Sequence, residues 1–276
     1  MKRFWLITNP GSGSAQQLLP EALTRMLIAC GVEAAGHTPF PDQPFPDAAT
    51  LMEAKVDTVV LFAGDGTVNA ALCALDGWPG AFLVLPGGTM NMLAKQLHES
   101  VDTAAIVTAA CAATTLTALP MARAAEHRAF VGVIIGPAAH WGRARELTRS
   151  RAVSRLWRAI RFAWRRTFGR GIKVGGVIGL QGRYQAIMVR PLPGELSVCG
   201  IDARDLGQIV ELGWTWLTGE WLLAGAVTPS RSARLEILGS KPVQALFDGE
   251  ARLLAPGTEI TPALTRPMFL ATRRPA

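Results

Sequence analysis

The first 114 residues alternate short apolar runs with longer segments whose apolar positions recur at helical spacing. Phe4–Ile7, Val59–Phe62 and Ala81–Leu85 are apolar throughout, which is typical of strands buried on both faces. An edge strand is expected at about 32–38, and helices at about 15–30, 47–55 and 102–113. The Ala- and Leu-rich segment that follows Thr67 predicts a further helix. Strands that alternate with helices predict a parallel sheet with helices on both faces.

From residue 115 onward the pattern changes to short segments with strand character, separated by turns. The expected strands are 116–122, 128–135, 172–180, 184–189, 196–199, 208–212, 235–238, 244–248 and 268–272. Many short strands at regular spacing predict an antiparallel sandwich or a barrel-like domain. We therefore expect an α/β domain over residues 1–114 and an all-β domain over residues 115–276.

A glycine-rich turn with one carboxylate, Ala63-Gly64-Asp65-Gly66-Thr67, follows the central apolar run. Glycine lets a backbone approach an anion closely, and a helix start presents free N–H groups at its positive end. An ordinary strand–helix turn would explain this loop alone. Two similar loops, Asn9–Ser14 and Pro86–Asn91, follow neighbouring strands, and the carboxyl ends of parallel strands are where ligands bind. The three loops together predict a phosphate site.

A pair of carboxylates near the C-terminus, in Asp248-Gly249-Glu250, is the second candidate for chemistry. In an extended segment the two side chains would point the same way, and Gly249 would leave room for a substrate. Such a pair can supply a general base or share a metal ion. The alternative is a hairpin turn with two solvated acids, which is the more common context of an isolated Asp-Gly-Glu.

A strongly basic segment, Trp141–Arg170, interrupts the expected strands with ten arginines and a single acid, Glu146. Its large apolar residues, from Leu156 to Phe168, fall on one face of a helix. A basic amphipathic helix with aromatic residues is typical of a peripheral contact with an anionic membrane surface. The alternative is that the apolar face packs onto the protein and the arginines are merely solvated. No recognition motif for nucleic acid accompanies the charge.

The overall composition agrees with a globular protein that meets an anionic partner. Of 276 residues 49% are hydrophobic and 18% charged, and the formal net charge is +7. The four cysteines form no CxxC pair, which favours free thiols in a reducing compartment. We find neither a signal peptide nor a membrane span in the apolar pattern. We expect a cytoplasmic protein that associates peripherally with membranes.

The three loops and the late Asp-Gly-Glu, in this order and spacing, resemble the diacylglycerol kinase catalytic-domain family, which includes bacterial soluble lipid kinases and the sphingosine and ceramide kinases. The family's Asn-Pro-x-Ser-Gly matches Asn9–Gly13, and its Gly-Gly-Asp-Gly-Thr-x-Asn matches Ala63–Asn69 with alanine for the first glycine. Its Pro-x-Gly-Thr-x-Asn-Asp-x-Ala-Arg/Lys motif matches Pro86–Lys95, with methionine at position 92 in place of aspartate.

The resemblance implies a Rossmann-like α/β domain of the NAD kinase and diacylglycerol kinase type, a C-terminal antiparallel β-sandwich, and ATP held between them. It implies a phosphotransferase of phospholipid biosynthesis that uses ATP and Mg²⁺ to phosphorylate a lipid hydroxyl. Glu250 is the implied proton acceptor, beside Asp248 and with Asp65 as a further catalytic residue, and Asp205 and Asp202 are the nearest magnesium candidates. The ATP-binding positions are Asn9, Pro10, Gly11, Ser12, Gly13, Thr38, Ala63, Gly64, Asp65, Gly66, Thr67, Asn69, Gly87, Gly88, Thr89 and Asn91.

Other functions remain open at this level. A membrane-associated pseudokinase that binds nucleotide or lipid with little catalysis would share these loops, and the departures at Ala63 and Met92 are compatible with it. An NAD kinase-like enzyme uses a similar Gly-Gly-Asp-Gly loop. The acceptor could be diacylglycerol, a sphingoid base, phosphatidylglycerol or a monoacylglycerol, and the oligomeric state leaves no trace in the sequence.

Overall fold

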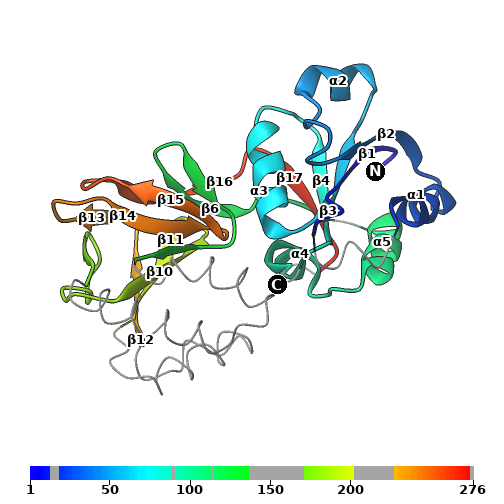
Figure 1. Ribbon diagram of the computed structural model, residues 1–276. Coiled ribbons are helices and arrows are strands. Elements are labelled where there is room, and N and C mark those ends of the chain that lie inside the picture. The colour runs from blue at the N-terminus through cyan, green and yellow to red at the C-terminus, as the bar shows by residue number, and fades with distance from the viewer. Residues whose placement is uncertain (13–18, 89–90, 114, 137–170, 202–226, 274–276) are drawn as a thin grey trace, which may run out of the picture. The chain divides into compact units, whose positions relative to one another are not determined.

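A computed structural model describes residues 1–12, 19–88, 91–113, 115–136, 171–201 and 227–273 (Figure 1). The chain divides into two compact units, one formed by Met1–Leu119 with Leu264–Ala276 and the other by Pro120–Ala263. Helices and strands mix in the first unit, and the described part of the second consists of strands and turns. The expected α/β region followed by an all-β region is therefore confirmed.

One six-stranded sheet, in the order β2-β1-β3-β4-β17-β5, forms the centre of the first unit. Its strands are β1 Arg3–Thr8, β2 Glu33–Pro39, β3 Thr58–Ala63, β4 Ala81–Pro86, β5 Thr115–Thr117 and β17 Met268–Ala271. Neighbouring strands from β2 to β17 run parallel, and β5 runs antiparallel to β17. Every residue of β3 is buried, as its uninterrupted apolar run predicts for a central strand.

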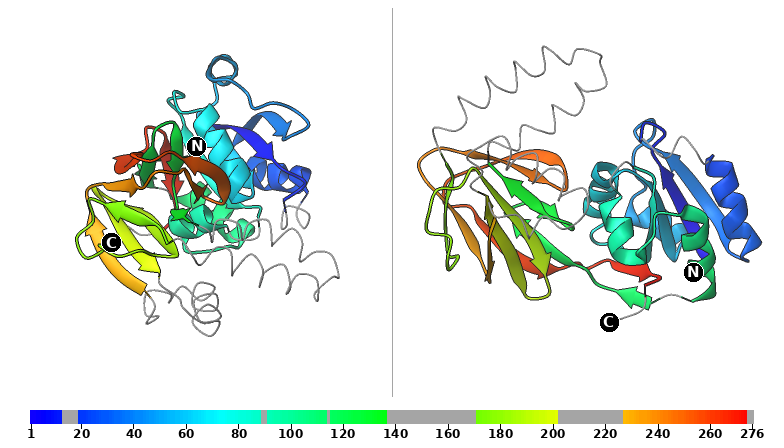
Figure 2. Two further views of the ribbon diagram at one scale, coloured as in Figure 1. Left: turned by 60° about the vertical axis from the view of Figure 1, so that its left-hand side comes forward. Right: turned by 90° about the horizontal axis from the view of Figure 1, so that it is seen from below.

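Five described helices connect these strands: α1 Pro20–Ala29, α2 Ala48–Glu53, α3 Asp65–Ala74, α4 Met92–His98 and α5 Thr103–Ala112. Their starts follow local sequence signals. The side chain of Asp47 accepts from the Thr50 backbone N–H to cap α2, and Asp102 caps α5 in the same way. α1 and α5 lie side by side (Figures 1 and 2) and pack on the sheet face that carries Leu6, Val60 and Leu83.

The last strand of the chain returns to the first sheet, which differs from the expected boundary. The sequence pattern assigned residues 115–276 to a single β domain, whereas β17 pairs with β4 and β5. Thr265 fixes this return, because its buried hydroxyl accepts from the Leu119 N–H at 2.9 Å and its own N–H donates to the Leu119 carbonyl. A strand that pairs with residues about 190 positions earlier leaves no local signal of its partner.

His98, the last residue of α4, is buried and links β4 to the residue that follows β17 through hydrogen bonds. Its Nε2 lies 3.0 Å from the Val84 carbonyl oxygen, and its Nδ1 lies 3.0 Å from the Thr272 hydroxyl. A carbonyl can only accept, so Nε2 carries the hydrogen and Nδ1 accepts from Thr272. Burial lowers the pKa of His98 from the usual 6.5 to about 4, although the carbonyl of Val84 favours the charged form.

We expect His98 to make the protein acid-sensitive. The unfolded chain binds a proton at His98 below pH 6.5 and the folded chain only below about 4, so unfolding takes up a proton within that window. The contribution of His98 to stability should be constant above pH 6.5 and fall by about 3 kcal/mol as the pH decreases to 4. Urea unfolding at several pH values measures this slope. His98→Gln should reduce it, and an unchanged slope in this variant would contradict the assignment.

The second unit is built from two sheets, in the orders β12-β11-β10-β8-β14-β15 and β7-β6-β16-β13-β9. The strands are β6 Pro120–Ala124, β7 His127–Ala129, β8 Val133–Ile135, β9 Lys173–Gly175, β10 Ala186–Leu192, β11 Glu195–Ile201, β12 Val227–Ser232, β13 Leu235–Leu238, β14 Val243–Phe247, β15 Glu250–Leu254 and β16 Glu259–Leu264. One apolar core draws on both sheets, for example Ile187 and Phe247 from the first and Ile237 and Ile260 from the second.

Several strands of this unit differ from their expected bounds. The expected strand 172–180 is only β9, because the chain turns away at Gly176 and Gly179, both with positive φ. β15 and β16 were not expected, since their exposed and charged positions weaken the alternation. The expected strand at 208–212 and the basic segment Trp141–Arg170 lie outside the described residues.

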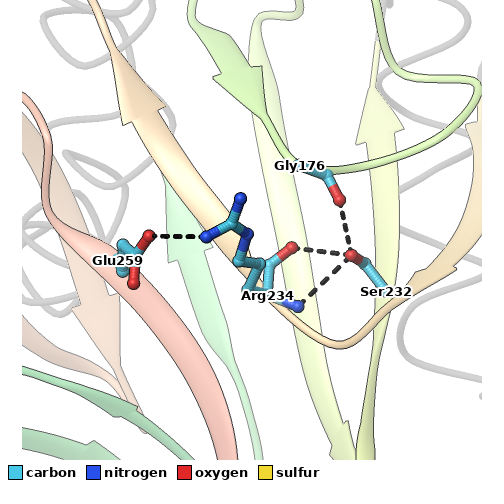
Figure 3. A network of polar contacts seen from close by, with 4 residues as sticks. All are labelled: Gly176, Ser232, Arg234 and Glu259. Carbon is cyan, nitrogen blue, oxygen red and sulfur yellow. Dashed lines mark hydrogen bonds and ion pairs between the residues drawn. The ribbon is translucent and has the colours of Figure 1, made fainter.

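A small polar network ties the tight turn between β12 and β13 to the end of β9 (Figure 3). The hydroxyl of Ser232 lies 2.6 Å from the Gly176 carbonyl and 2.7 Å from the Arg234 carbonyl, and it accepts from the Arg234 N–H. Arg234 also pairs with Glu259 of β16 at 3.3 Å. Both charged side chains are largely exposed, so this pair adds little stability and mainly orients the turn.

Among the helices described, none is long and apolar enough to cross a bilayer.

Candidate active site

The candidate site lies at the edge of the first sheet where the central parallel strands end. β1, β3 and β4 end level with one another, since Thr8 pairs with Phe62 and Ala63 pairs with Pro86. Each strand is followed by one of the polar loops that the sequence singled out. The structure therefore brings all three loops to one edge, where ligands of parallel sheets bind.

The first loop is fastened to the second by side-chain hydrogen bonds. The Asn9 amide nitrogen donates to the Thr67 hydroxyl at 2.8 Å, while its amide oxygen accepts from the Gly11 N–H at 2.8 Å. The Ser12 hydroxyl accepts from the Gly64 N–H at 3.1 Å. Asn9 and Ser12 thus both contact the glycine-rich turn. Gly13 lies outside the described residues.

The second and third loops meet through their glycines. A methyl group at Gly88 would lie 2.6 Å from the Gly64 Cα, and one at Gly87 would overlap the Ala63 backbone. No residue larger than glycine fits either position without moving a main chain. The third loop is closed by Asn91, whose side chain accepts from the Gly88 N–H at 2.7 Å and donates to its carbonyl at 2.9 Å. Thr89 lies outside the described residues.

Asp65 joins the glycine-rich turn to the start of α4. Its carboxylate accepts from the Met92 N–H at 2.9 Å, although it belongs to the first turn of α3. Burial raises the pKa of Asp65, and the backbone N–H donors at the start of α4, Met92 first among them, oppose that rise. A carboxylate kept in a site that disfavours its charge is a frequent mark of function.

The first turn of α3 provides donors at the centre of this edge. Gly64 is its N-cap, and Asp65, Gly66 and Thr67 follow. Their N–H groups have no carbonyl partner within the helix, and they lie at the positive end of its dipole. Glycines that admit a close approach, together with such N–H groups, form a suitable cradle for a phosphate group. Asn69 lies further along the same helix, where it contacts Cys73.

The remaining expected residue of this unit, Thr38, lies beneath the surface. Its hydroxyl is buried and accepts from the Trp5 indole N–H at 3.0 Å, an arrangement that Gly36 permits by leaving room for the indole. The neighbouring His37 was not singled out, yet its exposed ring reaches the Thr8 hydroxyl at 2.8 Å, next to the first loop. Burial of part of the ring lowers the pKa of His37, and the charge of Glu21 opposes this.

The Asp-Gly-Glu of the second unit is a hairpin turn, so the expected extended geometry is wrong. β14 and β15 are joined by Asp248 and Gly249 alone, and Phe247 pairs with Glu250. Both turn residues have positive φ, 48° and 95°, which fits the Asp-Gly preference of tight hairpins. The alternative, a hairpin turn with two solvated acids, is right about the turn but not about Asp248. Asp248 accepts backbone hydrogen bonds from Phe130, Val131 and Gly132, whereas Glu250 is exposed.

The metal candidates Asp202 and Asp205 lie outside the described residues. Within the described part of the chain, no three His, Cys, Asp or Glu side chains are grouped as ligands of a metal ion. Asp65 is the acidic side chain at the loop edge, and one of its oxygens is already bound by Met92. A magnesium ion at this edge would therefore need further oxygen ligands from its substrate or water.

Residues 3–123 match the family model of the diacylglycerol kinase catalytic domain. A search of the curated proteins gives no match. A solved structure described as one of the diacylglycerol kinases of Bacillus anthracis str. Sterne is similar, with 14% identity, 98% of this chain and 97% of that chain covered, and a TM-score of 0.61. Another from that organism, described as "a putative diacylglycerol kinase", has 17% identity, the same coverage and a TM-score of 0.66. At these identities the structural likeness concerns the fold.

Proposed function

Because residues 3–123 match the family model of the diacylglycerol kinase catalytic domain, we propose that the protein is an ATP-dependent lipid kinase that transfers the γ-phosphoryl group of ATP to a lipid hydroxyl. The observation that carries the proposal is the meeting of three loops at one sheet edge, joined by the Asn9–Thr67, Ser12–Gly64 and Asp65–Met92 hydrogen bonds. Phosphoryl transfer needs mainly positioning and neutralisation of charge, and backbone N–H groups on rigid loops supply both.

The proposed nucleotide site uses the residues of these loops. The N–H groups of the α3 start, from Asp65 to Thr67, would bind phosphate oxygens, while Gly87 and Gly88 keep the neighbouring loop close. Asn9, Ser12 and Asn91 would hold the loop conformations through the hydrogen bonds given above. Thr38 is buried, so we propose that it supports the sheet edge through Trp5.

Magnesium is part of the proposed chemistry as the partner of the ATP phosphates. Asp65 would orient it, since Mg²⁺ in such sites binds to few carboxylates and keeps water and phosphate ligands. Glu250 would accept the proton of the attacking hydroxyl. The net charge of +7 and the ten arginines of Trp141–Arg170 support attraction to an anionic membrane, where a diacylglycerol-like or sphingoid acceptor resides, and a cytoplasmic, peripheral location.

The finer fold assignment is part of the same proposal. A Rossmann-like domain of the NAD kinase and diacylglycerol kinase type is supported by the parallel order β2-β1-β3-β4. A β-sandwich is supported by the single core shared between the two sheets of the second unit. A pseudokinase and an NAD kinase-like enzyme are the alternatives, and the choice of acceptor distinguishes all three.

The proposal predicts transfer of labelled phosphate from ATP to at least one lipid of a panel in mixed micelles with Mg²⁺. Asp65→Asn should lower this activity by about tenfold to a hundredfold, because the negative charge that would orient Mg²⁺ beside the phosphates is lost. The amide oxygen of the asparagine can still accept from the Met92 N–H. The variant should be no less stable at pH 7, since burial raises the pKa of Asp65 and thus disfavours its charge in the folded chain. Thermal melting and initial rates measure both effects.

Asp42→Asn, at an exposed loop position, serves as the matched control and should change neither quantity. Phosphorylation of NAD but of no lipid would identify an NAD kinase-like enzyme. Saturable ATP binding without transfer to any acceptor would identify a pseudokinase. Full activity in Asp65→Asn would remove Asp65 from the proposed chemistry.

A further inference from the structure

We propose that Asp248 is a positioning residue that fastens the Asp-Gly-Glu turn to the backbone of residues 130–132, so that Glu250 alone accepts the substrate proton. The proposal rests on the lipid kinase function proposed above. It gives Asp248 a role of its own, which the Asp-Gly-Glu pattern by itself does not assign.

The carboxylate of Asp248 is surrounded by backbone donors from the segment before β8. Oδ2 accepts from the Phe130 N–H at 2.7 Å, and Oδ1 accepts from the N–H groups of Val131 and Gly132, both at 2.9 Å. The Asp248 N–H donates in turn to the Gly132 carbonyl at 3.1 Å. Three consecutive donors on one carboxylate, all at short distances, form a charge-assisted clasp between two parts of the chain.

This clasp engages the oxygens that a general base would need. A carboxylate oxygen has two lone-pair sites, and both sites of Oδ1 are directed to backbone N–H groups. A proton delivered to Oδ1 would have to displace one of these bonds and leave a backbone donor without its partner. Oδ2 already accepts from the Phe130 N–H, and all three donors favour the ionised carboxylate, so we infer that Asp248 is the poorer proton acceptor of the two acids.

The turn itself also explains why an aspartate stands at this position. Asp248 has a φ of 48° and is followed by Gly249 at 95°, and a two-residue hairpin with two positive φ values favours Asp-Gly or Asn-Gly. The clasp and the turn act together: the side chain holds the segment before β8, and the backbone leads directly to Glu250.

Glu250 has the opposite surroundings. It is the first residue of β15, it is exposed, and its carboxylate has no hydrogen-bond or ion-pair partner among the residues that the structure describes. Its backbone is nevertheless held in place, because it pairs with Phe247, which is buried and pairs with Val133 on its other side. A free carboxylate on a fixed backbone is what a general base requires.

In the proposed reaction, the lipid hydroxyl oxygen forms a bond to the γ-phosphorus while its proton passes to the Glu250 carboxylate. The bond from the γ-phosphorus to the bridging oxygen breaks, and ADP leaves with that electron pair. Asp248 stays ionised and hydrogen-bonded throughout, and its contribution is the placement of Glu250.

The experiment compares Asp248→Asn, Asp248→Ala and Glu250→Gln in the full chain, with pH profiles of kcat/KM and amide hydrogen exchange. Asparagine keeps an acceptor for Val131 and Gly132 and suits the turn, but its NH2 group replaces the acceptor of the Phe130 N–H, so one of the three bonds is lost. Asp248→Asn should therefore retain activity within about tenfold of wild type, with an unchanged KM for ATP and the acid limb of the pH profile preserved. Asp248→Ala should lose more, about a hundredfold, and the amides of 130–132 should exchange faster.

Abolished transfer in Asp248→Asn, with the acid limb gone and the amides of 130–132 still protected, would overturn the proposal and assign Asp248 as the base. Unchanged exchange rates of the amides of residues 130–132 in Asp248→Ala would also overturn it, because the Asp248 carboxylate would then not stabilise this segment. If wild type phosphorylates no lipid, the proposed function fails, and the exchange data alone decide whether Asp248 secures the turn.

Discussion

Replacing Glu250 by glutamine should reduce phosphoryl transfer by about 10²-fold to 10⁴-fold, the usual contribution of a general base. Glutamine matches glutamate in size, and the exposed side chain has no partner among the described residues, so the fold should be unaffected. The KM for ATP should also stay the same, because the proposed nucleotide site consists of residues from the three loops of the first unit. Single-turnover rates with the best lipid acceptor measure the effect.

Glu259→Gln is the matched control in the same unit. Glu259 also stands at the start of an antiparallel strand, and it pairs with Arg234 on the surface (Figure 3). Loss of this exposed pair should lower the stability by at most about 1 kcal/mol and leave transfer unchanged. Equal activity of Glu250→Gln and wild type would exclude Glu250 as the base and direct attention to Asp65.

The elements that define the loop edge could be predicted from the sequence, because their signals are local. The apolar run Val59–Phe62 predicts a buried central strand, and every residue of β3 is indeed buried. The glycines after it predict a close approach of main chains, which Gly64 and Gly88 make. The resemblance to the diacylglycerol kinase catalytic domain, inferred from these motifs, is confirmed for residues 3–123.

The contacts that give individual residues their roles could not be predicted, because each joins segments that are distant in sequence. Nothing near Asp65 indicates that its carboxylate accepts from Met92, which stands where the family motif has a further aspartate. The clasp of Asp248 spans 116 to 118 positions, and the pairing of β17 with β4 spans still more. Sequence periodicity reports which face of a strand is buried, but it carries no information about which strand lies beside it.

Replacing Gly87 by alanine should be the most damaging single-methyl change in the first unit. The added methyl group would overlap the Ala63 backbone nitrogen and lie 2.7 Å from the Phe62 carbonyl carbon and 2.8 Å from the Ala63 Cα. All three atoms are main chain of the central strand β3, so no side-chain rotation relieves the overlap. We expect a loss of about 3 kcal/mol in the free energy of unfolding, at the upper end of the usual effects of overpacking. Urea unfolding measures it.

Gly77→Ala is the control that isolates this clash. Gly77 is exposed, its added methyl group would have no heavy atom within 4 Å, and its φ is not positive. The same chemical change should therefore be neutral or stabilise the protein by about 0.5 kcal/mol, since alanine restricts the unfolded chain. Because Gly87 is the first residue of the third loop beyond β4, Gly87→Ala should also displace this loop and weaken ATP binding, even at temperatures where the variant remains folded. If Gly87→Ala is as stable as Gly77→Ala and binds ATP with unchanged affinity, then β3 and the third loop can move apart without harm. The close packing of the three loops would then not be required for the nucleotide site.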